Sequence, residues 1–238
     1  TGAKHRVTRR LHRPVKEMLI GLQTSTNQIS YATPTHKFHI YDPQTKETKL
    51  KKAHEISKGE MLIYPRNTTI KDDPEITSDM CKILGYYLAE GCTILGSDRQ
   101  PRYASIAFHV KEEHMVEELE TLCEKEFGHF DKKTHKSEKY SRVLKKYNKI
   151  SNPNCLETNI NIKQVAQLLC DWGGRVSYEK RLDERFLYLP FDKQEQLLAG
   201  LFNGDAHTNP NSHTLCWTTN SRTLVNQVRF ILARLGLY

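Results

Sequence analysis

A short pattern of apolar and small residues occurs twice in this chain. Residues 83–91 read ILGYYLAEG, and residues 198–206 read LAGLFNGDA. Each copy has glycine in third place, apolar residues around it, and an acid in eighth place, Glu90 in the first copy and Asp205 in the second. A polar gap, strand-like residues and an amphipathic helix pattern follow each copy. The chain is therefore predicted to contain an internal duplication of one helix–strands–helix substructure.

The glycines of the two copies indicate that two helices pack closely. Gly85 and Gly200 lie inside apolar helix patterns, where glycine costs about 1 kcal/mol relative to alanine. We expect the two helices to meet at these glycines, which brings Glu90 and Asp205 together at the helix C-terminal ends. The helix macrodipole disfavours a carboxylate there, and two adjacent carboxylates repel each other unless a cation lies between them. Hard divalent cations take carboxylate oxygens and water, so Glu90 and Asp205 are predicted to bind Mg²⁺.

The two copies resemble the paired motifs of the LAGLIDADG homing endonucleases, and the resemblance extends from about residue 78 to the end of the sequence. It implies an αββαββα fold in each half and a saddle of strands lying along double-stranded DNA. It also implies that Glu90 and Asp205 are catalytic and hold Mg²⁺ for phosphodiester hydrolysis. Glu90 replaces the more common aspartate of the family. Ala206 replaces the terminal glycine, which strains the turn if that position needs a positive φ.

A further segment, YEKRLDERFLYLP at residues 178–190, resembles one that intein-borne members of the family carry before the second acidic motif. Lys180 matches the lysine that assists the attacking water or neutralises charge, which makes it a third catalytic candidate. The alternative is an ordinary surface lysine. Asp183 stands where proline is usual, so the local backbone conformation stays open.

The charge of the chain favours a polyanionic partner. The net charge is +8, and residues 132–149 hold eight Lys or Arg and one Glu, a balance typical of nucleic-acid binding. In the LAGLIDADG fold this stretch falls on the DNA-facing hairpin of the first half, and the alternative for each residue is a solvated loop position. The candidate DNA-binding residues are Lys132, Lys133, Lys136, Lys139, Arg142, Lys145 and Lys146, with Tyr140 or Tyr147 packing along the groove.

The first seventy residues have the short β-prone runs of a β-rich module. ATPTHKF at residues 32–38 and KKAHEISKGEMLIYP at residues 51–65 resemble parts of the Hint, or intein splicing, domain. The resemblance implies that Thr33 and His36 hydrogen-bond the scissile peptide, whereas the alternative is a Thr and a His on an ordinary strand. The chain opens without a Cys or Ser nucleophile and closes without a His-Asn pair. We therefore expect an interior piece of an intein that lacks both splice junctions.

These patterns predict an α+β chain with three parts. They are a partial Hint module at residues 1–70, a linker at 71–78, and a pseudo-symmetric LAGLIDADG domain at 79–238. The first half of that domain covers about 79–175, and the second begins at about 176. The second half is expected to be incomplete, because the sequence ends one helix after its strand-like residues. A longer parent chain or a complementary intein fragment is then a further expected partner.

The predicted function is an intein-derived, site-specific double-strand DNA homing endonuclease that uses Mg²⁺. Two alternatives stay open: a LAGLIDADG-like DNA-binding protein without cleavage activity, and an intein whose nuclease has decayed. Six scattered cysteines without a Cys-x-x-Cys pair are typical of reduced core thiols and predict an intracellular, cytoplasmic protein. The sequence has neither a signal-peptide pattern nor an apolar run near the roughly 20 residues of a membrane span, so no membrane partner is expected.

Overall fold

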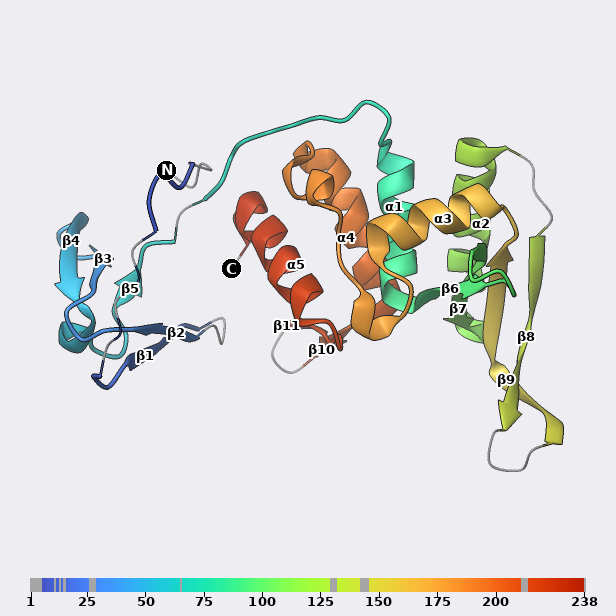
Figure 1. Cartoon of the computed structure of the whole chain (residues 1–238), viewed down its shortest axis with the longest axis horizontal. Coiled ribbons are helices and arrows are strands. Elements are labelled where there is room, and N and C mark those ends of the chain that lie inside the picture. Colours follow the sequence, from blue (N-terminus) through green and yellow to red (C-terminus); the bar gives the residue numbers. More distant parts are fainter. Residues whose placement is uncertain are drawn as a thin grey trace. The chain divides into compact units, whose positions relative to one another are not determined.

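The computed structural model describes residues 6–237 except 11, 13, 15, 26–28, 65, 129–131, 142–145 and 211–213, and for 132–141 and 146–153 it describes the backbone only. The chain is α+β, and its strands pair antiparallel (Figure 1). It divides into two compact units, one of Thr1–Thr69 with residues 236–238 and one of Ile70–Leu235. Each unit is described below by itself.

The first unit consists of short strands. β1 (Ile20–Gln23) pairs with β2 (Ile29–Ala32), and a second sheet has the order β4-β3-β5. Its strands and the one-turn helix η1 are β3 (Lys37–Asp42), β4 (Glu47–Lys52), η1 (Ala53–Glu55) and β5 (Met61–Leu62). Gly59 precedes β5 with a φ of +94°, a conformation that L-residues rarely adopt, which explains glycine at this turn. The unit is β-rich, as the sequence predicts.

The first copy of the repeated pattern lies mainly in α1 of the second unit, and α1 begins a series of elements in the order αββαββα. They are α1 (Ser78–Glu90), β6 (Gly91–Leu95), β7 (Pro101–His109), α2 (Glu113–Phe127), β8 (Lys132–Ser141), β9 (Lys146–Ile160) and α3 (Lys163–Gly173), with the one-turn helix η2 (Val110–Glu112) before α2. The four strands form one sheet of order β6-β7-β9-β8. Helices α2 and α3 both pack on β7, and α3 also packs on β6. This is the element order that the family resemblance implies for one half.

The second copy begins with the same elements. After η3 (Ser177–Glu179) and η4 (Glu184–Tyr188) come α4 (Phe191–Asp205), β10 (Ala206–Asn209), β11 (Thr214–Trp217) and α5 (Arg222–Leu235). Within the described part of the chain, the sheet of this copy contains β10 and β11 alone. The register repeats as well, because Ala206 lies opposite Trp217 where Gly91 lies opposite Ile106 in the first copy. The duplication therefore holds at the level of strand register.

The core of the second unit gathers around α1 and α4, which lie side by side (Figure 1). Ile83 and Leu84 of α1 are fully buried, and Leu197 and Leu201 of α4 are each 1% exposed. Helix α1 is capped by Thr77, whose side chain accepts a hydrogen bond from the Met80 amide. Threonine is one of the residues that commonly cap a helix in this way.

Two further expectations concern the whole chain. All six cysteines lie among the described residues and are free thiols. None of the helices that the structure describes is long and apolar enough to cross a membrane.

Candidate active site

Two carboxylates end the two helices that carry the repeated pattern. Glu90 is the last residue of α1, and Asp205 is the last residue of α4. Neither helix has a basic residue in its last turn, so no side chain within the helix offsets the negative pole of its macrodipole. Whatever stabilises these charges must come from outside the two helices.

The two helices approach most closely at the repeated glycines. A Cβ atom on Gly85 would lie 2.3 Å from the carbonyl oxygen of Leu197, and one on Gly200 would lie 2.3 Å from the carbonyl oxygen of Lys82. These distances are far inside van der Waals contact, so no larger residue fits either position without moving backbone. The helices meet at Gly85 and Gly200, as their placement in the sequence indicates.

The close approach continues to the helix ends. Gly204 and Ala89 are the residues directly before the two acids, and a Cβ on Gly204 would lie 2.7 Å from the Cβ of Ala89 and 3.9 Å from the Cγ of Glu90. Glu90 and Asp205 therefore leave their helices at neighbouring points of one interface.

The environment of the pair favours its protonated form in the metal-free chain. Burial raises the pKa of Glu90, and the negative charges of Asp205 and Glu112 raise it further. Burial also raises the pKa of Asp205, while the nearby indole of Trp217 lowers it in part. A cation placed between the carboxylates would reverse these effects, because it favours both charged forms.

The donor set suits a hard divalent cation. Within the described residues, no three His, Cys, Asp or Glu side chains cluster so that they could hold a metal ion by themselves. Among the described His, Cys, Asp and Glu side chains, the site thus offers Glu90 and Asp205 as its candidate ligands. Mg²⁺ is commonly held in this way, by one or two carboxylates with waters and substrate phosphates completing its shell.

The residue after each acid has an extended backbone. The φ of Gly91 is −95° and that of Ala206 is −102°. Ala206 is therefore unstrained, and the strain that a positive φ would have caused does not arise.

Lys180 lies beneath the end of α1. Its side chain is buried, with 3% of the residue exposed. The Nζ atom donates a hydrogen bond to the carbonyl oxygen of Tyr87 at 2.8 Å and lies 3.4 Å from the centroid of the Tyr87 ring. Burial lowers the pKa of this amine to about 7. The surface-lysine alternative is therefore wrong, and Lys180 is a second donor to the Tyr87 carbonyl oxygen, which also accepts a hydrogen bond from the Gly91 amide.

The backbone around Lys180 is fixed by the elements on both sides of it. The hydroxyl of Ser221, just before α5, donates to the carbonyl oxygen of Lys180 at 2.5 Å. Asp183, where proline is usual, uses the amide that proline lacks: its N–H donates to the carbonyl oxygen of Trp172 at 2.9 Å. The Asp183 side chain also accepts from the Arg185 amide and caps η4. Asp183 therefore closes this loop in place of a proline.

The basic stretch forms the predicted hairpin. Strands β8 and β9 pair antiparallel, with Lys133 opposite Asn159 and Lys132 opposite Ile160. The backbone of Lys132, Lys133, Lys136, Lys139, Tyr140, Lys146 and Tyr147 lies in these strands. Arg142 and Lys145 lie outside the described residues.

The predicted splicing residues share one turn between β2 and β3 in the first unit. The amide of His36 donates to the carbonyl oxygen of Thr33 at 3.0 Å. His54 of η1 supports this turn, because its amide donates to the carbonyl oxygen of Pro34 at 3.2 Å and its ring Nδ1 lies 2.8 Å from the same oxygen. His36 is exposed and Thr33 is half-buried.

Two residues near the carboxylates were missed by the sequence reasoning. Glu112 of η2 acts on Glu90 through its charge, and Trp217 of β11 acts on Asp205. Both lie in the parts that follow the repeated pattern, and only the strand register brings them to the helix ends. The sequence contains two tryptophans. Their small number does not by itself indicate that Trp217 lies beside Asp205.

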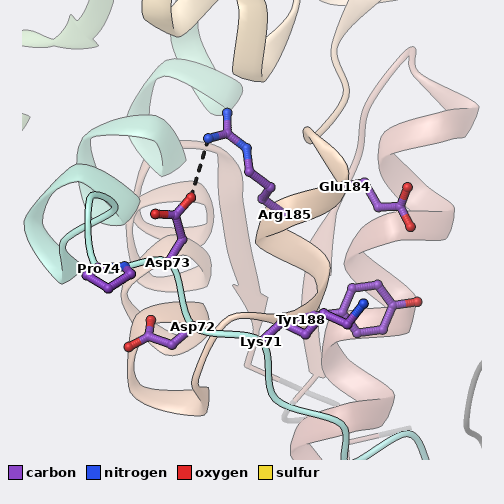
Figure 2. Close-up of a pocket in the computed structure, with 7 residues that line it drawn as sticks. All are labelled: Lys71, Asp72, Asp73, Pro74, Glu184, Arg185 and Tyr188. Atoms are coloured by element: carbon purple, nitrogen blue, oxygen red, sulfur yellow. Dashed lines mark hydrogen bonds and ion pairs between the residues drawn. The ribbon is translucent and has the colours of Figure 1, made fainter.

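A hollow of about 440 Å³ lies elsewhere in the second unit, between residues 71–74 and η4 (Figure 2). Its lining is Lys71, Asp72, Asp73, Pro74, Glu184, Arg185 and Tyr188. Figure 2 shows the ion pair that joins Arg185 to Asp73, at 3.4 Å. The amide of Lys71 donates to the carbonyl oxygen of Tyr188 at 2.8 Å. These contacts anchor part of the segment expected as a linker to the second unit.

The protein-family model of the LAGLIDADG-like domain matches residues 192–238 of this sequence. The match includes most of α4 with Asp205, the β10–β11 pair and α5. Residues 192–238 of this chain are thus similar to the LAGLIDADG-like domain. The matched part supplies one of the two carboxylates of the site, and α1 supplies the other.

The chain is also similar to parts of longer proteins. An uncharacterised protein of Methanocaldococcus jannaschii is 29% identical over 216 residues, covering 77% of this chain and 23% of that protein. An iron–sulfur cluster assembly SufBD family protein of Mycobacterium tuberculosis is 27% identical over 189 residues, covering 78% and 20%. The ATP-dependent DNA helicase Hel308 of Methanocaldococcus jannaschii is 22% identical over 244 residues, covering 98% and 17%. The chain thus spans about a fifth of the length of these relatives.

Among solved structures, I-DmoI in complex with its target DNA, in the presence of manganese, aligns with a TM-score of 0.48 at 11% identity. The alignment covers 68% of this chain and 78% of that one. A likeness at this level does not assign a fold.

Proposed function

We propose that this chain is part of an intein-derived, site-specific homing endonuclease that cuts double-stranded DNA by Mg²⁺-dependent phosphodiester hydrolysis. The observation that carries the proposal is the pair of carboxylates, Glu90 and Asp205, that end two helices packed through Gly85 and Gly200. A site with two partly buried carboxylates and no basic residue in either helix end is costly without a cation. A function that uses the cation explains why the site exists.

Glu90 and Asp205 would hold the Mg²⁺ ion, and DNA phosphates and waters would complete its shell. When bound, the ion supplies stabilisation of phosphate charge and an activated water. Lys180 would contribute to the chemistry through its side-chain amine. Because the pKa of its amine is lowered to about 7, Lys180 Nζ holds or releases a proton near neutral pH, next to the last turn of α1.

Double-stranded DNA is the proposed partner of the β8–β9 hairpin. Eight Lys or Arg between residues 132 and 149 provide the positive charge that phosphate binding needs. The hairpin extends the same sheet whose first strand, β6, begins directly after Glu90. DNA lying on this sheet would therefore be close to the carboxylates.

The relatives support an inserted element. A segment shared by an iron–sulfur cluster assembly family protein and a DNA helicase, and covering about a fifth of each, does not follow from either protein's named activity. A self-excising insert would occur in unrelated hosts in this way. The turn that holds Thr33 and His36 fits the same interpretation, with Hint-type splicing as the role of the first unit. The remainder of a parent chain, or a complementary intein fragment, would then complete the protein.

The test uses the protein with the rest of its parent reading frame and a plasmid carrying the host gene joined without the insert. We expect Mg²⁺-dependent linearisation at the junction, which EDTA abolishes. Asp205→Asn and Glu90→Gln should bind the junction without cutting it. Specific binding without cutting by the unaltered protein would instead identify the cleavage-deficient DNA-binding alternative. Splicing without DNA binding would identify an intein with a decayed nuclease.

A further inference from the structure

Trp217 has a buried indole N–H group within the described part of the chain. Its Nε1 atom is buried, and it has no hydrogen-bond partner among the residues that the structure describes. Indole nitrogen is a donor only, and a buried tryptophan usually finds an acceptor for it. An orphaned donor of this kind calls for an explanation from the site around it.

The indole sits beside Asp205. Trp217 is the register partner of Ala206, the residue directly after Asp205. Its ring also meets the ring of Phe202, one turn before Asp205, edge-on at 6.1 Å between centroids. Strand pairing and ring packing thus hold the indole against the last turn of α4. The indole also lowers the pKa of Asp205, against the effect of burial, as a donor near the charged carboxylate does.

The first copy of the repeat has no such donor. Ile106 occupies the position that corresponds to Trp217, opposite Gly91 and fully buried. An isoleucine side chain contacts its neighbours through apolar atoms only. The two positions therefore differ: a residue with an N–H donor lies opposite the residue after Asp205, and a residue with an apolar side chain lies opposite the residue after Glu90.

We propose that Trp217 is a positioning residue for Asp205: its indole N–H donates to one carboxylate oxygen and fixes the other toward the cation. The proposal rests on the proposed function, because it presumes that Asp205 binds a divalent cation. Side chains that bind metals are commonly oriented by a hydrogen bond from a neighbouring residue. Hydrogen bonds of this kind are often long before the ligand binds and tighten in the complex, which accounts for the unpartnered Nε1.

Two measurements on the whole chain test the role of Trp217. Mg²⁺ binding is measured by calorimetry, and the indole N–H resonances are followed by ¹⁵N NMR, where the two tryptophans give two signals. Trp217→Phe keeps an aromatic ring against Phe202 and removes only the N–H donor. Trp172→Phe is the matched control, because Trp172 packs in the core against Phe186, at 5.1 Å between ring centroids.

We expect Trp217→Phe to weaken Mg²⁺ binding roughly 10- to 100-fold, as removal of such a supporting hydrogen bond does elsewhere, while Trp172→Phe leaves it unchanged. Mg²⁺ should move the Trp217 indole signal downfield in the unaltered chain but not in Asp205→Asn. If Trp217→Phe binds Mg²⁺ as well as the unaltered chain, the positioning role is overturned and the metal site stands. If the unaltered chain binds no Mg²⁺, the metal site of the proposed function fails, and the role of Trp217 fails with it.

Discussion

At the scale of single residues, Glu90 and Asp205 are charges placed where the surrounding protein disfavours them. Burial and mutual repulsion raise the pKa of Glu90, and burial raises that of Asp205. The folded chain therefore binds protons at these groups more readily than the unfolded chain. The protonated carboxyl groups of Glu90 and Asp205 therefore contribute to the stability of the fold at low pH. This contribution is lost as pH rises from about 4, the ordinary carboxyl pKa, through the raised pKa.

Removing either charge should therefore stabilise the metal-free protein at neutral pH. We expect Asp205→Asn and Glu90→Gln to raise Tm at pH 7, with each kcal/mol of relief corresponding to about 2–4 °C in a domain of this size. The gain should shrink below pH 4, where the carboxyls are protonated in both states. Thermal unfolding measured against pH checks this.

The control for this prediction is Asp192→Asn, which makes the same change in the first turn of α4, where a negative charge is favourable. It should lower Tm slightly. A decrease in Tm for Asp205→Asn at pH 7 would contradict the account of the site as a repelling pair.

The lowered pKa of Lys180 predicts that the stability of the fold depends on pH in the opposite direction. Its pKa is lowered to about 7 in the folded chain, whereas the unfolded lysine holds its proton up to about 10.4. Between these values the unfolded state binds more protons, so stability rises with pH. From pH 7 to 8.5, Lys180 should add about 1–2 kcal/mol to the free energy of unfolding.

Lys180→Met, which keeps most of the volume of the side chain, should remove that rise. Urea unfolding of the unaltered chain and of the variant at several pH values between 7 and 8.5 measures it. Unfolded cysteines begin to ionise in this range, but they do so equally in both proteins, so their contribution cancels in the comparison. A rise of the same size in the variant would show that Lys180 titrates normally.

At the scale of elements, the α1–α4 interface includes direct backbone contact at the two glycines. An added Cβ on Gly200 would lie 2.3 Å from the Lys82 carbonyl oxygen. We therefore expect Gly200→Ala to destabilise the fold by at least about 3 kcal/mol, in the range of severe overpacking. Gly200→Leu should prevent folding by forcing the helices apart.

Glu195→Ala, at an exposed position of the same helix, is the control and should change stability by less than about 0.5 kcal/mol. Chemical unfolding of the three variants makes the comparison. If Gly200→Ala were neutral, the helices would not meet at the glycines.

The β8–β9 hairpin carries the prediction for DNA binding. Replacing Lys145 and Lys146 by Ala should weaken binding to all duplexes alike. It should also lower the slope of log K against log salt by roughly 2, about one for each lysine that no longer neutralises a phosphate. Fluorescence anisotropy at several salt concentrations measures both quantities.

Lys37→Ala with Lys58→Ala removes the same charge from exposed positions of the first unit. This control separates the effect of the hairpin lysines from the effect of the net charge. Equal effects of the two double variants would place the DNA surface outside the hairpin.

At the scale of the whole molecule, the two copies of the repeat differ in how far their sheets extend. β7 pairs with both β6 and β9, whereas β11 pairs, within the described residues, with β10 alone. By the symmetry of the duplication, the other edge of β11 is the position at which a further strand would pair. We predict that such a strand comes from the rest of the parent protein or from a complementary fragment.

Hydrogen exchange of the amides in residues 215–217 that point away from β10 tests this prediction. Their exchange should be fast in this chain and slower by at least about tenfold in the longer parent protein, where the added strand would accept their hydrogen bonds. The β7 amides serve as the internal reference and should exchange slowly in both. Equal protection of β11 in both proteins would mean that no strand is added there.

The sequence by itself determined the duplicated pattern, the helices that carry it and the charge of the hairpin. These features are local or periodic: an apolar helix pattern, a glycine inside it and an acid at its end can each be found without knowing the fold. The LAGLIDADG resemblance depends on the same residues, and the match over residues 192–238 confirms it. The proposed roles of Glu90, Asp205 and Lys180 remain predictions.

Only the tertiary structure decided what surrounds those residues. The burial of Lys180 against Tyr87, the nearness of Glu112 to Glu90 and the indole of Trp217 beside Asp205 all join residues that are distant in the sequence or on different elements. The physical reason is that desolvation and charge interactions depend on distances across packed elements. Strand register and helix crossing set those distances, and neither can be deduced from the apolar periodicity of one segment.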